Sequence, residues 1–192
     1  FRADGVVQPG ATVQLGLRDW QVHAAPGHDP HSVVLFEPQR RLLISADALW
    51  ERGFGVVFPE LEGEQAFAEV EATLDVIEQL QPEWVLPGHG GMFSDVAGAL
   101  TVARKRLADF QADPQRHAQY AAKVLLKYKL LEWQQASCQQ VQDWCASTPL
   151  MQQMRQRYFA DQDPAAWVLA LLQALAAARA VVWEGDQVRN VD

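Results

Sequence analysis

The stretches Pro26-Gly27-His28-Asp29-Pro30-His31-Ser32, Ile44-Ser45-Ala46-Asp47 and Leu86-Pro87-Gly88-His89-Gly90 decide the fold of this chain. Each carries a metal-competent side chain directly after a predicted strand, in the order His, Asp, His. Zinc takes imidazole nitrogen and carboxylate oxygen at about 2 Å, and strand ends give such ligands rigid supports. The three side chains are therefore predicted to converge at one edge of a sheet.

The hydrophobic pattern around these stretches predicts a sheet followed by two helices. Short apolar runs bounded by turn residues are typical of strands, and the third and fourth runs form a hairpin. Further on, apolar side chains recur every three or four positions, which indicates helix faces, and Ser94 is a suitable N-cap for the second helix. The predicted strands are 13–17, 20–24, 32–36, 42–45 and 84–86, and the predicted helices are 64–80 and the segment from Ser94 through Phe110.

As a set, these motifs resemble the metallo-β-lactamase superfamily over residues 5–112. Residues 26–32 resemble its third metal motif, Asp47 its bridging aspartate, and His89 its last histidine. The resemblance implies an α/β (α+β) fold, the C-terminal half of an αββα sandwich, with His28, Asp47 and His89 as ligands. It also implies zinc, as one or two divalent metals in the intact protein. Asp47 is typical of the glyoxalase II-like, ribonuclease-like and other general hydrolase branches, whereas β-lactamases proper often have cysteine there.

The first motif of that superfamily, H-x-H-x-D-H, has no counterpart in this sequence. His23 and His28 are five positions apart and His28 and His31 are three apart, and neither pair is followed by Asp-His. Because the chain also begins at Phe1, it is interpreted as a fragment that is inactive alone, with an empty or partly filled metal site. A half-domain is expected to pair, as a homodimer or with a missing N-terminal half.

A boundary is predicted at Asp113-Pro114, which divides residues 1–113 from residues 114–192. Beyond it the pattern predicts three helices and then a strand, a tight turn and a strand. This order resembles the small winged-helix domain appended to some hydrolases of the same superfamily. The predicted elements are helices 120–131, 137–145 and 164–175, a short helical turn at 151–159, and strands at 181–183 and 188–189.

Three aromatic side chains, Trp50, Phe54 and Phe58, follow Asp47 in a glycine-containing loop. They are candidates for an apolar substrate pocket beside the metal, and the alternative is a core plug under the sheet. His31 is either a helper near the site or a solvated loop residue. His117 has no partner in the sequence and is interpreted as a surface residue.

The resemblance implies a metal-dependent hydrolase in which metal-activated water attacks an ester, thioester or phosphodiester, with a small-molecule ester or thioester as the substrate. The alternatives are a ribonuclease of the same fold and a non-catalytic protein-interaction module with a vestigial metal site. The net charge of −8 argues against nucleic acid as a partner. No apolar run is long enough to span a membrane, and the cysteines, Cys138 and Cys145, are interpreted as thiols of a reducing compartment, the cytoplasm.

Overall fold

The computed structural model describes residues 5–191. The chain divides into two compact units that meet between Ala112 and Asp113. This division lies beside the Asp113-Pro114 pair at which the sequence predicts a boundary. The two units are described one at a time.

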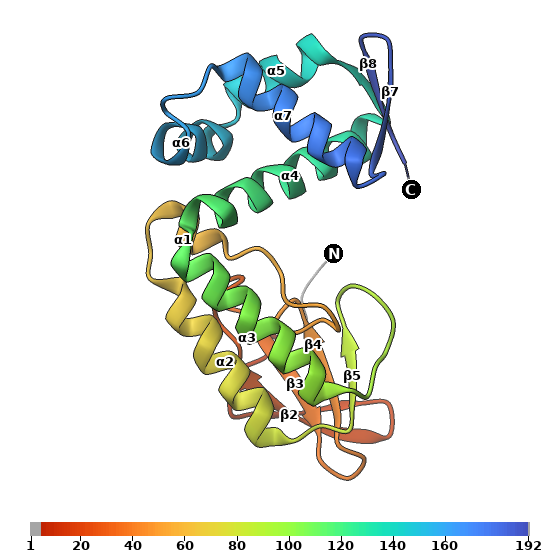
Figure 1. Ribbon diagram of the computed structural model, residues 1–192. Coiled ribbons are helices and arrows are strands. Elements are labelled where there is room, and N and C mark those ends of the chain that lie inside the picture. The colour runs from red at the N-terminus through yellow and green to blue at the C-terminus, as the bar shows by residue number, and fades with distance from the viewer. Residues whose placement is uncertain (1–4, 192) are drawn as a thin grey trace. The chain divides into compact units, whose positions relative to one another are not determined.

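The N-terminal unit contains a five-stranded sheet with the order β1-β2-β3-β4-β5 (Figure 1). The first four strands pair antiparallel with their neighbours, whereas β5 runs parallel to β4. Strands β2, β4 and β5 therefore point the same way, and their carboxyl ends lie at one edge of the sheet. The strands are β1 (Thr12–Leu15), β2 (Arg18–Ala24), β3 (Val33–Glu37), β4 (Leu42–Ala46) and β5 (Trp84–Pro87).

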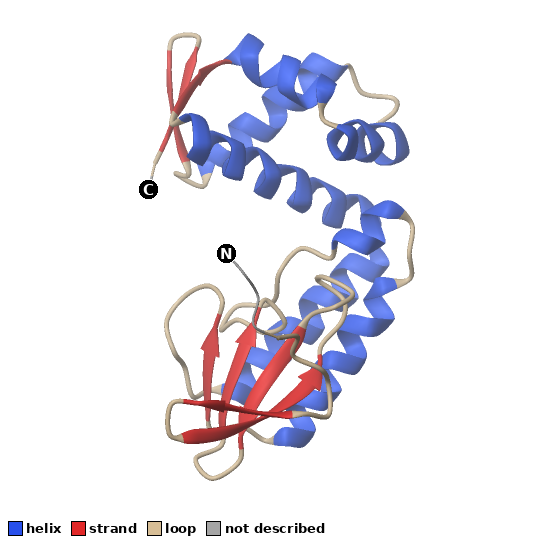
Figure 2. Ribbon diagram, turned by 180° about the vertical axis from the view of Figure 1, so that it is seen from behind, coloured by secondary structure: helices blue, strands red, loops and turns tan. Residues whose placement is uncertain are grey.

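Helices α2 (Ala66–Leu80) and α3 (Val96–Ala112) cover one face of this sheet (Figure 2). Helix α2 lies in the connection between β4 and β5, as the parallel pairing of those strands requires. A short helix, α1 (Phe58–Glu62), precedes it and was not predicted. Asp95, not Ser94, holds the start of α3, because its Oδ1 accepts a hydrogen bond from the Gly98 N–H at 3.0 Å.

The other face of the sheet carries a row of apolar side chains. Leu35 pairs with Ile44, and Ile44 pairs with Leu86, so the three lie side by side on neighbouring strands. All three are only half-buried. Their strand neighbours Leu43 and Val85 point to the opposite, helix-covered face and are fully buried.

The C-terminal unit contains four helices and a small sheet of order β6-β8-β7. Asp113, Ser137 and Asp163 are the N-caps of α4, α5 and α7, and each accepts a hydrogen bond from a backbone N–H three residues later. The three-residue strand β6 was not predicted, and the winged-helix assignment stays a prediction. The elements are α4 (Pro114–Trp133), β6 (Gln135–Ser137), α5 (Cys138–Ser147), α6 (Pro149–Tyr158), α7 (Pro164–Ala177), β7 (Val181–Glu184) and β8 (Gln187–Asn190).

His117 is buried, so its interpretation as a surface residue was wrong. Its exposed fraction is 1%, and it shares the buried face of α4 with Ala121, one turn further along. Burial lowers the pKa of His117 to about 4, because the charged imidazolium loses its hydration. The side chain is therefore neutral at pH 7. Among the described residues, no helix is both long and apolar enough to cross a membrane.

Candidate metal centre

His28 lies in the loop after β2 with its ring held in one orientation. Its Nδ1 lies 2.5 Å from the backbone oxygen of Val56. A carbonyl oxygen can only accept a hydrogen bond, so Nδ1 carries the proton of the neutral ring and Nε2 keeps its lone pair. The ring also lies against Phe58, with centroids 5.6 Å apart. This is the arrangement in which metal-binding histidines are usually held.

Asp47 directly follows β4 and lies between the two histidines. Its Oδ2 is 3.4 Å from Nε2 of His28, and its Oδ1 is 3.7 Å from Nδ1 of His89. His89 follows β5, and its side chain is 53% exposed. The parallel pairing of β4 with β5 and the common direction of β2 explain why three residues far apart in the sequence meet here.

These donors fit part of a metal site. Two ligands bound at about 2.1 Å to a tetrahedral ion lie about 3.4 Å apart, which is the separation of His28 Nε2 and Asp47 Oδ2. Among residues 5–191, however, no group of three or more His, Cys, Asp and Glu side chains forms a site able to hold a metal. The geometry therefore gives two adjacent pairs that share Asp47, and the ligand role of the three residues stays a prediction.

Two glycines allow the backbone to approach Asp47 closely. A Cβ on Gly88 would lie 2.8 Å from Asp47 Oδ1 and 3.1 Å from the carbonyl of Ala46. A Cβ on Gly55 would lie 2.7 Å from Nδ1 of His28 and 3.0 Å from the Cβ of Asp47. Any larger residue at either position would displace a predicted ligand. Gly88 lies in the Leu86-Pro87-Gly88-His89-Gly90 stretch, whereas the part played by Gly55 was not predicted.

The sequence left two alternatives for the aromatic residues after Asp47, a substrate pocket beside the metal or a plug in the core. The three residues do not all have the same surroundings. Trp50 stacks on His89, with ring centroids 4.9 Å apart and planes at 4°, and Phe58 lies beside His28. Phe54 is only 2% exposed and packs its ring edge-on against Phe110 in the core. Phe54 is thus a core residue and does not belong among the pocket candidates, because its loop turns inward there.

The remaining candidate, His31, is exposed. Its backbone N–H donates to the carboxylate of Asp29 at 2.8 Å, which forms a tight turn just after His28. His23 is half-buried on β2, and burial lowers its pKa. The Nε2 atom of His23 is buried and has no hydrogen-bond partner among the described residues. His23 is thus placed as a packing residue.

Parts of this chain are similar to known proteins. Residues 1–89 match the family model described as the metallo-beta-lactamase superfamily. The match covers less than half of the chain and includes His28, Asp47 and His89. The acyl-coenzyme A thioesterase MBLAC2 of Gallus gallus is 26% identical over 92 residues, which make up 48% of this chain and 33% of that protein. The chain thus spans about a third of the length of the curated relatives it matches.

Solved structures are similar to this chain as well. A beta-lactamase domain protein from Burkholderia ambifaria is 24% identical, with a TM-score of 0.48, over 97% of this chain and 52% of that one. A protein solved in a di-iron-bound form is 26% identical, with a TM-score of 0.41, over 50% of this chain and 46% of that one.

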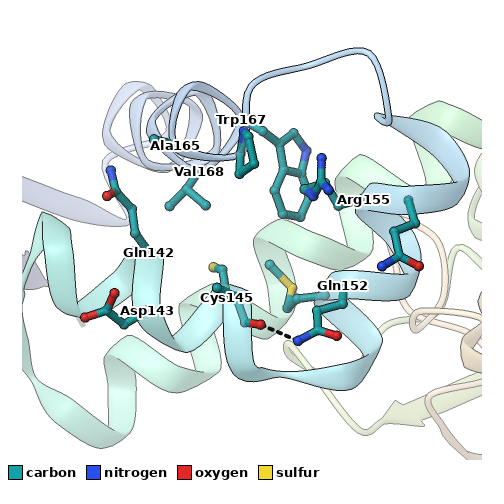
Figure 3. A pocket seen from close by; sticks show the side chains of 12 residues that line it. Gln142, Asp143, Cys145, Gln152, Arg155, Ala165, Trp167 and Val168 are labelled. Atoms are coloured by element: carbon teal, nitrogen blue, oxygen red, sulfur yellow. Dashed lines mark hydrogen bonds between the residues drawn. The ribbon is translucent and has the colours of Figure 1, made fainter.

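The C-terminal unit contains a pocket that the sequence analysis did not predict. It has a volume of about 390 Å³ and lies between α5, α6 and α7 (Figure 3). Cys145, Met151, Trp167 and Val168 form apolar parts of its wall, and Arg155 brings a guanidinium group to it. Burial raises the pKa of the Cys145 thiol to about 12, so this cysteine is not a nucleophile at neutral pH.

Proposed function

We propose that this chain carries the His28, Asp47 and His89 ligands of a metal-dependent hydrolase that cleaves thioesters. The observation that carries the proposal is the convergence of His28 Nε2 and Asp47 Oδ2 at 3.4 Å, with Nδ1 of His28 fixed by Val56. The superfamily binds divalent metals. The thioester comes from the curated relatives, which are named as acyl-coenzyme A thioesterases.

Each residue has a separate task in this proposal. A bound divalent ion supplies a Lewis acid and an activated water near neutral pH. His28 presents the lone pair of Nε2, and its second nitrogen keeps the ring from turning. Asp47 offers two oxygens, one facing each histidine. Trp50 and Phe58 place apolar surface beside these polar groups, where an acyl chain would be sheltered from water.

The ribonuclease alternative has less support. Between Pro164 and Ala177, helix α7 contains no Lys or Arg, and the net charge of the chain is −8. Phosphate contacts by basic residues supply most of the affinity for nucleic acids. The C-terminal unit is therefore proposed not to bind duplex DNA or RNA. A non-catalytic interaction module would need no metal, so metal content separates it from the hydrolase.

The full-length protein that carries this chain is expected to release coenzyme A from an acyl-coenzyme A. A thiol-reactive dye can follow the release against a control without substrate, and burial raises the pKa values of both Cys138 and Cys145. A chelator should abolish the activity, and zinc should restore it. Hydrolysis of a carboxylic ester and of a phosphodiester should be measured beside it, because these are the competing substrate classes. Activity that survives the chelator, or hydrolysis of the phosphodiester alone, would contradict the proposal.

The half-buried row of Leu35, Ile44 and Leu86 is proposed to pair with a second copy of the chain or with the remainder of the protein. Apolar rows that stay partly exposed tend to find partners. At micromolar concentration the chain should therefore sediment as a dimer. Leu35→Lys should shift it toward monomer, because a charge in the row would lose its hydration on pairing. Leu17→Lys, at a fully exposed position, is the matched control. A monomeric parent chain would rule the dimer out.

A further inference from the structure

The residue that links the two sides of the candidate metal centre is Trp50. Its indole N–H donates a hydrogen bond to Asp47 Oδ1 at 3.1 Å. The face of the same indole stacks on the imidazole of His89, with centroids 4.9 Å apart and planes at 4°. A single side chain between β4 and α1 thus touches a residue that follows β4 and a residue that follows β5.

The loop that carries Trp50 is held in place by backbone hydrogen bonds and by the side chain of Arg106. The Trp50 N–H donates to the Gly53 oxygen at 2.6 Å, and the Gly55 N–H donates to the Asp47 oxygen at 2.8 Å. Gly53 has φ of 121°, and a Cβ there would lie 2.5 Å from Nη1 of Arg106. Arg106 on α3 also donates to the Phe54 oxygen at 3.2 Å. The loop therefore presents Trp50 in a fixed orientation.

We propose that Trp50 is a positioning residue that sets the orientation of Asp47 and His89 for metal binding. The inference rests on the proposed function of that site. The indole N–H engages Oδ1 and so turns Oδ2 toward Nε2 of His28. The stacked indole restricts rotation of the His89 ring, which is more than half exposed and would otherwise sample several rotamers.

The hydrogen bond and the stacking can be separated by two substitutions. Trp50→Phe keeps an aromatic face and loses the N–H, whereas Trp50→Leu loses both. Groups that orient metal ligands typically contribute about 10–100-fold to metal affinity. We expect Trp50→Phe to weaken cobalt(II) binding about tenfold and Trp50→Leu to weaken it about 100-fold. Trp84→Phe, at the opposite end of β5, should bind cobalt(II) like the parent chain.

A second measurement is independent of the metal. The stacked indole should shift the ring-proton NMR signals of His89 upfield in the metal-free chain, and Trp50→Leu should remove that shift. The unfolding temperatures of the metal-free variants should match that of the parent. If Trp50 had only a structural role, the variants would unfold at lower temperatures. If the parent binds cobalt(II) and Trp50→Leu binds it equally well, the positioning role is wrong and the proposed function stands. Absence of the His89 upfield shift in the parent chain would overturn the positioning role whether or not the parent binds cobalt(II).

Discussion

Asp47→Asn is expected to lower the cobalt(II) affinity of this chain by more than about 100-fold. Asp47 is the residue that both candidate pairs share, with oxygens 3.4 Å from His28 Nε2 and 3.7 Å from His89 Nδ1. Asparagine has the same shape, and its amide oxygen can still accept the hydrogen bond from Trp50. It lacks the negative charge, however, and it places an N–H₂ group where one oxygen stood. Loss of a ligand should exceed the 10–100-fold typical of residues that only support ligands.

The measurement is a titration followed by the visible absorption of bound cobalt(II). The parent chain is expected to bind at most one ion weakly, because only His28, Asp47 and His89 are available and water would fill the other positions. Asp19→Asn removes an exposed carboxylate from β2 and serves as the charge-matched control. Unchanged binding in Asp47→Asn would exclude Asp47 as a ligand. Two tightly held ions in the parent would show that ligands other than these three exist.

The strands that form the site's edge of the sheet could be predicted from the sequence. The contacts around that edge could not. The strands before His28, Asp47 and His89 were recognisable because each is an alternating or apolar segment that ends close to a turn or loop. The direction of these strands follows from chain connectivity, and it places the three residues at one edge. Short elements such as β6 and α1 lack enough residues to show a period, so the sequence did not reveal them.

The supporting residues were missed for a different reason. The roles of Gly55 and Arg106 depend on close approaches between segments that are distant in sequence. Phe54 and Trp50 are both aromatic residues of the same loop. Phe54 nevertheless enters the core, whereas Trp50 covers His89. The difference is set by the backbone of the loop, where Trp50 pairs with Gly53. No local pattern of residue types encodes that choice.

Gly27→Ala is expected to have the largest effect on stability, with a loss of about 4 kcal/mol from the N-terminal unit. Gly27 has φ of 126°, a conformation that residues with a Cβ rarely adopt. A Cβ there would also lie 2.5 Å from Cγ2 of Val70 and 3.1 Å from the Val70 backbone nitrogen on α2. Thr73 Oγ1 donates to the Pro26 oxygen at 2.9 Å, so the loop cannot easily move away from that helix.

Urea unfolding of Gly27→Ala beside Gly10→Ala separates the steric conflict from the backbone strain. Gly10 has φ of 85°, but a Cβ there would meet no atom within 4 Å, so alanine should cost only about 1–2 kcal/mol. Adding Val70→Ala to Gly27→Ala should recover part of the loss, because it removes the nearest atom and leaves the backbone contact. Since His28 follows Gly27 directly, the variant should also weaken cobalt(II) binding. Equal losses in Gly27→Ala and Gly10→Ala would show that α2 does not press against this loop, and that the position of His28 is not set by the packing of Gly27 on Val70.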